Sequence, residues 1–161
     1  MLFRSILDEA VSAVDVSIQA QILNLLRDLQ EKMGLTYLFI THDLSIVRYM
    51  SHEIAVLYKG RIVELGSRQE LFASPRHPYT LTLMNSIPDP FKTSRGGPVT
   101  FAIDEEIAEN DRGCNFRSRC NRFHGQNECL TIDPKLGNHG LMKIACHFPD
   151  AAKARLDSDA L

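Results

Sequence analysis

Apolar positions recur at helical spacing over residues 16–33 and crowd together without alternation over residues 36–40. The first pattern predicts an amphipathic helix that begins after Asp15, a candidate N-cap, and stops at Gly34. The second pattern, TYLFI, is β-branched and aromatic, which favours a strand buried on both faces, as in a parallel sheet. The apolar stripe expected to face the core consists of Ile18, Ile22, Leu25, Leu26, Leu29 and Met33.

Shorter elements follow, each marked by a turn or a capping signal. Two strand-like runs, EIAVLY and RIVEL, flank Lys59 and Gly60, and this arrangement predicts a hairpin. Ser67 and Glu70 match the S-x-x-E capping box, which predicts the start of a helix. Short helices are expected over residues 44–50, 68–73 and 77–88.

Composition narrows the class of protein. The chain has 161 residues, 44% of them apolar, and a net charge of −2, which argues against a nucleic-acid partner. Its apolar runs are too short for a membrane span or for the core of a signal peptide. We therefore expect a globular α/β protein in the cytoplasm.

Acidic residues and a histidine follow the two predicted parallel strands. Asp8 and Glu9 end the stretch ILDEA, and His42 follows the strand in ITHD. Since the carboxyl ends of parallel strands meet at one sheet edge, these side chains are expected to lie together. There an Asp can hold Mg²⁺, a Glu can activate water, and a His can bind a terminal phosphate or orient that water.

Each of these residues also has a purely structural interpretation. An acid pair after two apolar residues is often a solvated strand end, and a single histidine is often an exposed loop residue. Asp15, in SAVD, would lie at the same edge but is equally suited to cap the helix.

Together these motifs resemble the C-terminal half of an ABC-transporter nucleotide-binding domain over residues 6–66. ILDEA resembles the Walker B strand end, SAVD the D-loop and ITHD the switch-histidine loop. The resemblance implies that Asp8 binds Mg-ATP and that Glu9 and His42 are catalytic. It also implies that Ser12, in the D-loop, contributes to cofactor binding and that Asp15 belongs to a D-loop at a dimer interface.

The next segments narrow the resemblance. ELFASPRHPYTLTLMNSIPDP and the later GCNFRSRC and ACHFP are similar to the ATPase subunits of oligopeptide/dipeptide importers, which carry a C-terminal extension of this kind. This resemblance implies an ATPase at the cytoplasmic face of the cell membrane. Its partners would be a homologous ATPase subunit, transmembrane permease subunits and, indirectly, a peptide-binding protein.

The fold expected from these patterns is α/β: the C-terminal half of an ABC-type P-loop domain, with parallel strands, crossover helices and a hairpin. A small, loop-rich extension with a cysteine cluster follows it. The expected divisions are a non-native leader at 1–5, the nucleotide-binding half at 6–88, a linker at 89–113, the cysteine extension at 114–149 and a tail at 150–161.

Neither G-x-x-x-x-G-K-[ST] nor an L-S-G-G-Q-like signature occurs in these residues. We therefore expect a truncated reading frame that does not hydrolyse ATP alone, because a phosphate cradle and a partner's signature loop are needed for that chemistry. The alternative is a non-hydrolysing partner-binding or regulatory remnant with a structural metal site.

The cysteines follow the spacing C-x5-C-x8-C-x16-C, formed by Cys114, Cys120, Cys129 and Cys146. The surrounding segment has little apolar periodicity, so we expect it to bury little core and to need a metal as a staple. The long gaps and the family resemblance favour a [4Fe–4S] cluster; zinc and metal-free thiols are the alternatives. His124 and His147 are substitute ligands or ordinary surface residues.

Overall fold

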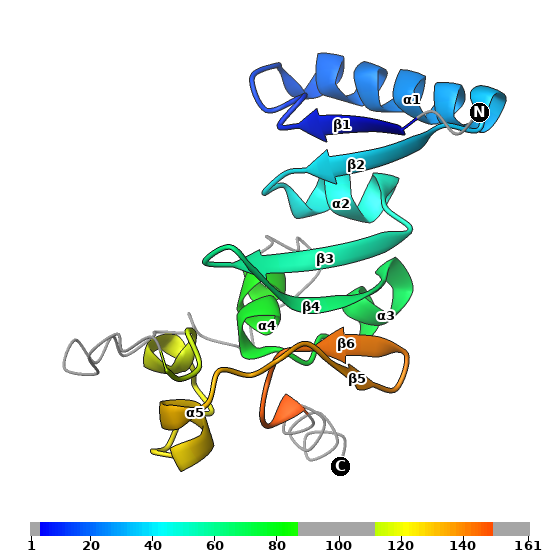
Figure 1. The fold of residues 1–161 in the computed structure, drawn as a ribbon. Helices are drawn as coiled ribbons and strands as arrows, with labels where there is room; N and C mark the ends of the chain where they lie inside the picture. Colours follow the sequence, from blue (N-terminus) through cyan, green and yellow to red (C-terminus); the bar gives the residue numbers. More distant parts are fainter. Residues whose placement is uncertain (1–3, 87–111, 150–161) are drawn as a thin grey trace, which may run out of the picture. The chain divides into compact units, whose positions relative to one another are not determined.

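A computed structural model describes residues 4–86 and 112–149 (Figure 1). The expected tail, most of the expected linker and the first three residues of the expected leader lie outside these ranges. The helices are α1 (Val16–Met33), α2 (Leu44–Met50), α3 (Arg68–Ala73), α4 (Pro78–Asn85), the 3₁₀ turn η1 (Arg117–Arg119) and α5 (Asn127–Thr131). The strands are β1 (Arg4–Asp8), β2 (Thr36–Ile40), β3 (Glu53–Tyr58), β4 (Arg61–Ser67), β5 (Gly137–His139) and β6 (Met142–Ile144).

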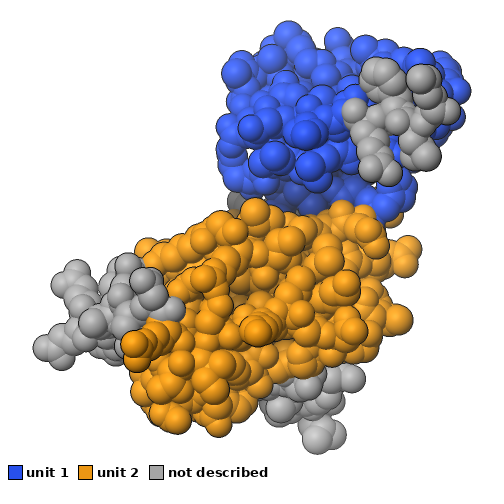
Figure 2. Space-filling model, in the orientation of Figure 1, with its two compact units in different colours: residues 1–52 blue, residues 53–161 orange. Residues whose placement is uncertain are grey.

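The chain divides into two compact units, Met1–His52 and Glu53–Leu161, which Figure 2 shows in different colours. Each has its own sheet, so the structure is mixed α/β, with a small parallel sheet and a separate antiparallel sheet. The unit boundary differs from the divisions expected from the sequence, which rest on family resemblance and stay predictions.

In the first unit, β1 and β2 pair in parallel, in a register that sets Asp8 opposite Ile40. The strand begins at Arg4, so two residues of the expected leader are part of it. Strand pairing uses backbone groups, which residues of any type can supply. The expected non-native leader at 1–5 stays a prediction.

Helix α1 joins the two strands and has the predicted bounds. The Asp15 carboxylate accepts hydrogen bonds from the backbone N–H groups of Ser17 and Ile18, at 3.0 and 2.9 Å. Gly34 ends the helix in the left-handed conformation, with φ of 63°, which favours glycine because it has no Cβ. Both helix signals in the sequence are thus confirmed.

The apolar core of this unit is smaller than the sequence predicts. It consists of Val11, Leu23, Ile46 and Met50, with Ile22, Leu26 and Phe39 packed against them.

Two burial predictions are wrong for this chain. Strand β2 is exposed at alternate positions instead of buried on both faces, and Leu38 is 58% exposed. In the predicted helix stripe, Ile18, Leu25 and Met33 are exposed. A sheet of two strands, about 5 Å apart, is too narrow to cover the whole apolar face of a helix about 10 Å wide.

In the second unit, the strands form one antiparallel sheet in the order β3-β4-β6-β5. The predicted hairpin is present, and its turn residues Lys59 and Gly60 have φ of 47° and 75°. Two successive positive φ angles are typical of the tight turn that matches strand twist, which explains the glycine. Ser67 caps α3 through its hydroxyl oxygen, which accepts from the Glu70 N–H at 3.3 Å.

The cysteine extension contributes more to the core than the sequence predicts. Its strand β6 pairs with β4, setting Ile144 opposite Glu64, so the extension completes the sheet instead of standing apart from it. Phe116, Met142 and Ile144 are buried. The expectation of little buried core is therefore wrong; strands of three residues are too short to give a periodic signal.

A buried carboxylate anchors the turn before α4. Glu64 is fully buried on β4, and its two oxygens accept the backbone N–H groups of Arg76 and His77, at 2.8 and 3.1 Å. His77 is also buried, and its Nδ1 accepts the N–H of Tyr79 at 3.1 Å, which caps α4. His77 thus packs and caps this turn.

We expect Glu64→Ala to lower the free energy of unfolding by roughly 4 kcal/mol, since it leaves two buried N–H groups without acceptors. Glu64→Gln should cost about half as much, because its single carbonyl oxygen still serves one donor. Urea unfolding measures both, with Glu53→Ala on an exposed strand position as the matched control. A change of under about 0.5 kcal/mol for Glu64→Ala would contradict this role.

His77 makes stability depend on pH. Its burial, and then the charge of Arg122, lower its pKa from 6.5 to about 4, so the folded protein favours the neutral ring. The contribution of His77 to the free energy of unfolding is complete above about pH 6.5 and falls as the pH drops towards about 4. Between about pH 7.5 and 5 the protein loses roughly 2 kcal/mol of stability through this group.

This pH dependence can be measured by urea unfolding at the two pH values. His77→Asn keeps a side-chain oxygen able to cap α4 but does not titrate. We expect its stability to change less than that of the wild type over the same pH range. Equal changes in the two proteins would assign the pH dependence to other groups.

Candidate functional site

The structure brings Glu9 and His42 into contact at the carboxyl ends of the two parallel strands. Nδ1 of His42 lies 3.1 Å from Oε1 of Glu9, within hydrogen-bonding distance. The side chains are 78% exposed for His42 and 55% exposed for Glu9. A carboxylate and an imidazole are thus paired at a solvent-accessible sheet edge, as the sequence predicts.

The β1–β2 pairing sets this contact. The backbone N–H of Glu9 donates to the carbonyl of Ile40 at 2.9 Å, which extends the ladder by one residue beyond Asp8. His42 lies in the short turn between β2 and α2. That turn is fixed because Asp43 caps α2, accepting from the N–H of Ser45 at 2.7 Å.

Glu9 has an unusual backbone conformation. Its φ of 44° lies in the left-handed region, which costs a residue with a side chain roughly 1–2 kcal/mol. The carbonyl of Glu9 accepts two hydrogen bonds from Ser12, at 3.1 Å from its N–H and 2.9 Å from its hydroxyl. These bonds close a turn directly after the strand.

The other predicted site residues lie on the same stretch. Asp8 is the last residue of β1 and is exposed, which leaves its carboxylate accessible to a cation. The Asp15 carboxylate is engaged as the N-cap of α1. Of the sequence-predicted residues, the structure therefore joins Glu9, His42 and Ser12 by hydrogen bonds and gives Asp15 a capping role.

This arrangement suits the activation of water. A carboxylate can accept a proton from a water molecule beside it, and the neighbouring imidazole can hold that carboxylate in position. An acid at the adjacent strand end, Asp8, adds a hard oxygen ligand of the kind Mg²⁺ prefers. The residues required to hold a nucleotide's phosphates are not among the motifs of these 161 residues.

In the second unit, all four cysteines line one small pocket, with a volume of about 20 Å³. Cys114 and Cys129 lie close, because the N–H of Cys114 donates to the carbonyl of Cys129 at 2.9 Å. Burial raises the pKa of every one of the four thiols. For Cys129 burial and the other three cysteines raise the pKa to about 11.

The pocket does not form a ready metal site. Across residues 4–86 and 112–149, no group of three or more His, Cys, Asp or Glu side chains is placed to hold a metal ion. The pocket has room for about one water molecule, far less than a four-iron cluster needs. His147, a substitute ligand in the sequence analysis, has its Nε2 2.9 Å from the carbonyl of Ile132.

Arginines hold this region together, and sequence reasoning missed them. Nη1 of Arg122 donates to the carbonyls of Arg76 at 2.9 Å and Phe148 at 3.3 Å. Arg117 is buried and donates to the carbonyl of Cys114 at 3.1 Å. The available signal in the sequence was the presence of arginines between the cysteines.

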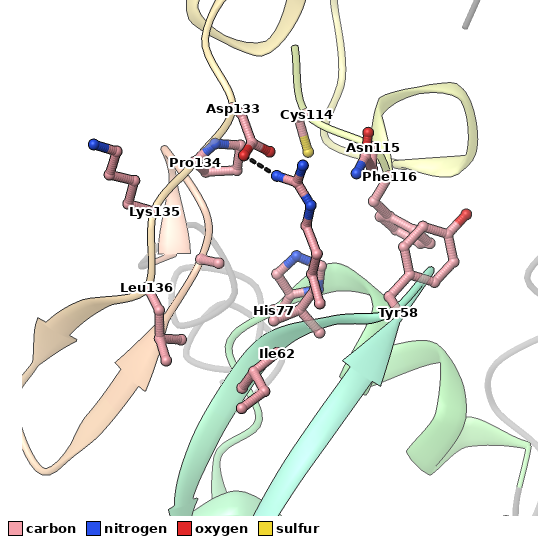
Figure 3. A pocket seen from close by; sticks show the side chains of 13 residues that line it. Tyr58, Ile62, His77, Cys114, Asn115, Phe116, Asp133, Pro134, Lys135 and Leu136 are labelled. Carbon is pink, nitrogen blue, oxygen red and sulfur yellow. Dashed lines mark hydrogen bonds and ion pairs between the residues drawn. The ribbon is translucent and has the colours of Figure 1, made fainter. Parts of the chain in front are cut away.

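A larger pocket of about 230 Å³ lies beside the cysteines, in the same unit (Figure 3). Tyr58, His77 and Phe116 form an aromatic part of its lining, and Arg61 and Asp133 form an ion pair within it. Its volume is below the roughly 300–1,000 Å³ usual for small-molecule sites. No pattern in the sequence indicated this pocket.

None of the helices in the described parts of the chain is both long and apolar enough to span a membrane.

Comparison with known proteins finds similarity to peptide transport proteins. Residues 63–129 match the family described as the C-terminal region of oligopeptide/dipeptide transporters. The match runs from within β4 to Cys129 and does not include Cys146.

Individual relatives extend the similarity over most of the chain. A candidate peptide import ATP-binding protein of Brucella abortus (strain 2308) is 45% identical over 143 residues, 88% of this chain and 41% of that protein. The dipeptide transport ATP-binding protein DppF of Escherichia coli (strain K12) is 41% identical over 146 residues, 90% of this chain and 43% of that protein. A further candidate from Brucella ovis is 48% identical over 130 residues.

The chain thus spans about two fifths of the length of the curated relatives it matches. The resemblance to ATP-binding subunits of peptide and dipeptide ABC transporters, inferred from the sequence motifs, is confirmed.

Proposed function

We propose that this chain is the C-terminal part of an ATP-hydrolysing subunit that energises peptide import through an ABC-type permease. The observation that carries the proposal is the contact between Glu9 and His42 at the carboxyl ends of paired parallel strands, 3.1 Å apart. The similarity to peptide import ATP-binding proteins supplies the substrate class.

Each residue of the site has a role in this proposal. Glu9 accepts the proton of the attacking water, and His42 holds the Glu9 carboxylate in position. The exposed carboxylate of Asp8 would hold Mg²⁺. When bound, Mg²⁺ neutralises charge that develops on the phosphate oxygens. Asp15 faces the partner subunit as part of the D-loop while its carboxylate caps α1.

The proposal also implies an assembly. The subunit pairs with a homologous ATPase subunit and docks on transmembrane permease subunits, at the cytoplasmic face of the cell membrane. A peptide-binding protein delivers the peptide to that permease. Hydrolysis at the interface of two ATPase subunits would then drive transport.

A second function concerns the cysteines. Their number, their kind and their common pocket support the binding of a [4Fe–4S] cluster as a structural staple, with Cys114, Cys120, Cys129 and Cys146 as ligands. The pocket of about 20 Å³ does not accommodate the cluster, so binding requires the residues around the pocket to rearrange. Zinc, which four thiolates bind in a tetrahedron, is the alternative metal.

We expect Glu9→Gln, in the complete subunit assembled with its partners, to lower the ATPase kcat by about 10²–10⁴-fold, since an amide cannot accept the proton. His42→Ala should cause a loss of similar size. Phosphate release in the presence of Mg-ATP measures both.

The matched controls are Glu53→Gln and His52→Ala. Glu53 is an exposed acid at the start of β3, and His52 is the exposed histidine directly before it. These should retain wild-type activity. Full activity in Glu9→Gln would reject the proposed site, and a complete wild-type subunit without activity would favour a non-hydrolysing, partner-binding role.

For the cysteines, we expect the chain, purified without oxygen, to contain about four iron atoms and to absorb near about 400 nm. Serine in place of any one cysteine should abolish or strongly reduce the iron content. His124→Ala and His147→Ala, beside the same segment, should not change it. Iron-free, colourless protein that retains stoichiometric zinc would reject the cluster in favour of zinc.

A further inference from the structure

The position of Glu9 depends on its backbone more than on packing. Its side chain is 55% exposed, so few neighbours restrict it. Its backbone, by contrast, is bound on both sides: its N–H donates to Ile40, and its carbonyl accepts from Ser12. The direction in which the carboxylate leaves the chain is therefore set by a turn held in the left-handed region.

Ser12 contributes to this turn in two ways. The bond from its N–H to the Glu9 carbonyl, 3.1 Å long, is available to any residue other than proline. The bond from its hydroxyl to the same oxygen, 2.9 Å long, is available only to a residue with a short side-chain donor. Of the two bonds, only the second therefore depends on which residue stands at position 12.

The geometry also shows that the hydroxyl of Ser12 is already engaged in a hydrogen bond. Its hydroxyl hydrogen is directed at the Glu9 carbonyl, so it is not available to a phosphate oxygen in this arrangement. A direct role in nucleotide binding, which the family resemblance implies, and a role in holding Glu9 are therefore distinct alternatives.

We propose that Ser12 is a positioning residue: its hydroxyl holds the left-handed turn at Glu9 and thereby keeps the Glu9 carboxylate beside His42. This inference rests on the proposed function, in which that carboxylate activates water. It assigns Ser12 an effect on the chemical step and none on nucleotide affinity.

The test compares Ser12→Ala, Ser12→Thr and the control Ser17→Ala in the complete subunit, by steady-state ATPase assay. Ser17 is an exposed serine in the first turn of α1. We expect Ser12→Ala to lower kcat roughly tenfold with KM for ATP unchanged, because a displacement of about 1 Å can cost up to a hundredfold. Ser12→Thr retains the hydroxyl and should recover most of the activity, and Ser17→Ala should behave as wild type.

A double-variant cycle separates positioning from a general structural effect. If Ser12 acts through Glu9 alone, Ser12→Ala should not lower the residual activity of Glu9→Gln any further. Amide exchange in the 161-residue chain gives a second, activity-independent measurement: the Glu9 N–H should exchange several-fold faster in Ser12→Ala than in Ser12→Thr.

Three outcomes would overturn the proposal: unchanged kcat in Ser12→Ala, a raised KM with unchanged kcat, or a threonine variant as impaired as alanine. The second would assign Ser12 to nucleotide binding. If Glu9→Gln is itself fully active, the proposed function fails, whereas an inactive Glu9→Gln with an active Ser12→Ala rejects this inference alone. Should Ser12→Ala not fold, Ser12→Cys, of similar size and a weaker donor, replaces it.

Discussion

The parallel pairing of β1 with β2 is the constraint on which the candidate site depends. Its register sets Asp8 opposite Ile40, and the next backbone bond, from Glu9 to that same Ile40, brings the two strand ends into line. His42, two residues beyond Ile40, then meets Glu9. A shift of one residue would turn each side chain of the strand to the opposite face. The contact between Glu9 and His42 therefore requires this register.

In the second unit, the buried Glu64 has a comparable role. It lies in the middle of the sheet, between partners on β3 and β6, and its carboxylate binds two backbone N–H groups of the turn before α4. Phe116, from the cysteine segment, packs against the ring of His77 in that turn. One carboxylate thereby links the sheet, the turn and the segment that carries the cysteines.

Sequence patterns predicted the elements whose signals are local. Asp15 and Gly34 bound α1, Lys59 and Gly60 formed the hairpin turn, and the strand ends brought Glu9 to His42. Interactions between distant segments were not predictable. A glutamate on a strand is expected to face solvent, so nothing local indicated that Glu64 would be buried. The left-handed Glu9 could not be foreseen either, since that conformation is rare for residues with a side chain.

Gly113 packs so closely against the chain that a Cβ there would lie 2.5 Å from the carbonyl oxygens of Cys129 and Leu130. This contact, with the backbone bond from Cys114 to Cys129, closes the loop between those cysteines through the protein alone. The entropy of closing the loop is thus already lost on folding. Any ligand of these thiols would bind a partly preorganised loop, and its affinity would depend mainly on moving the side chains.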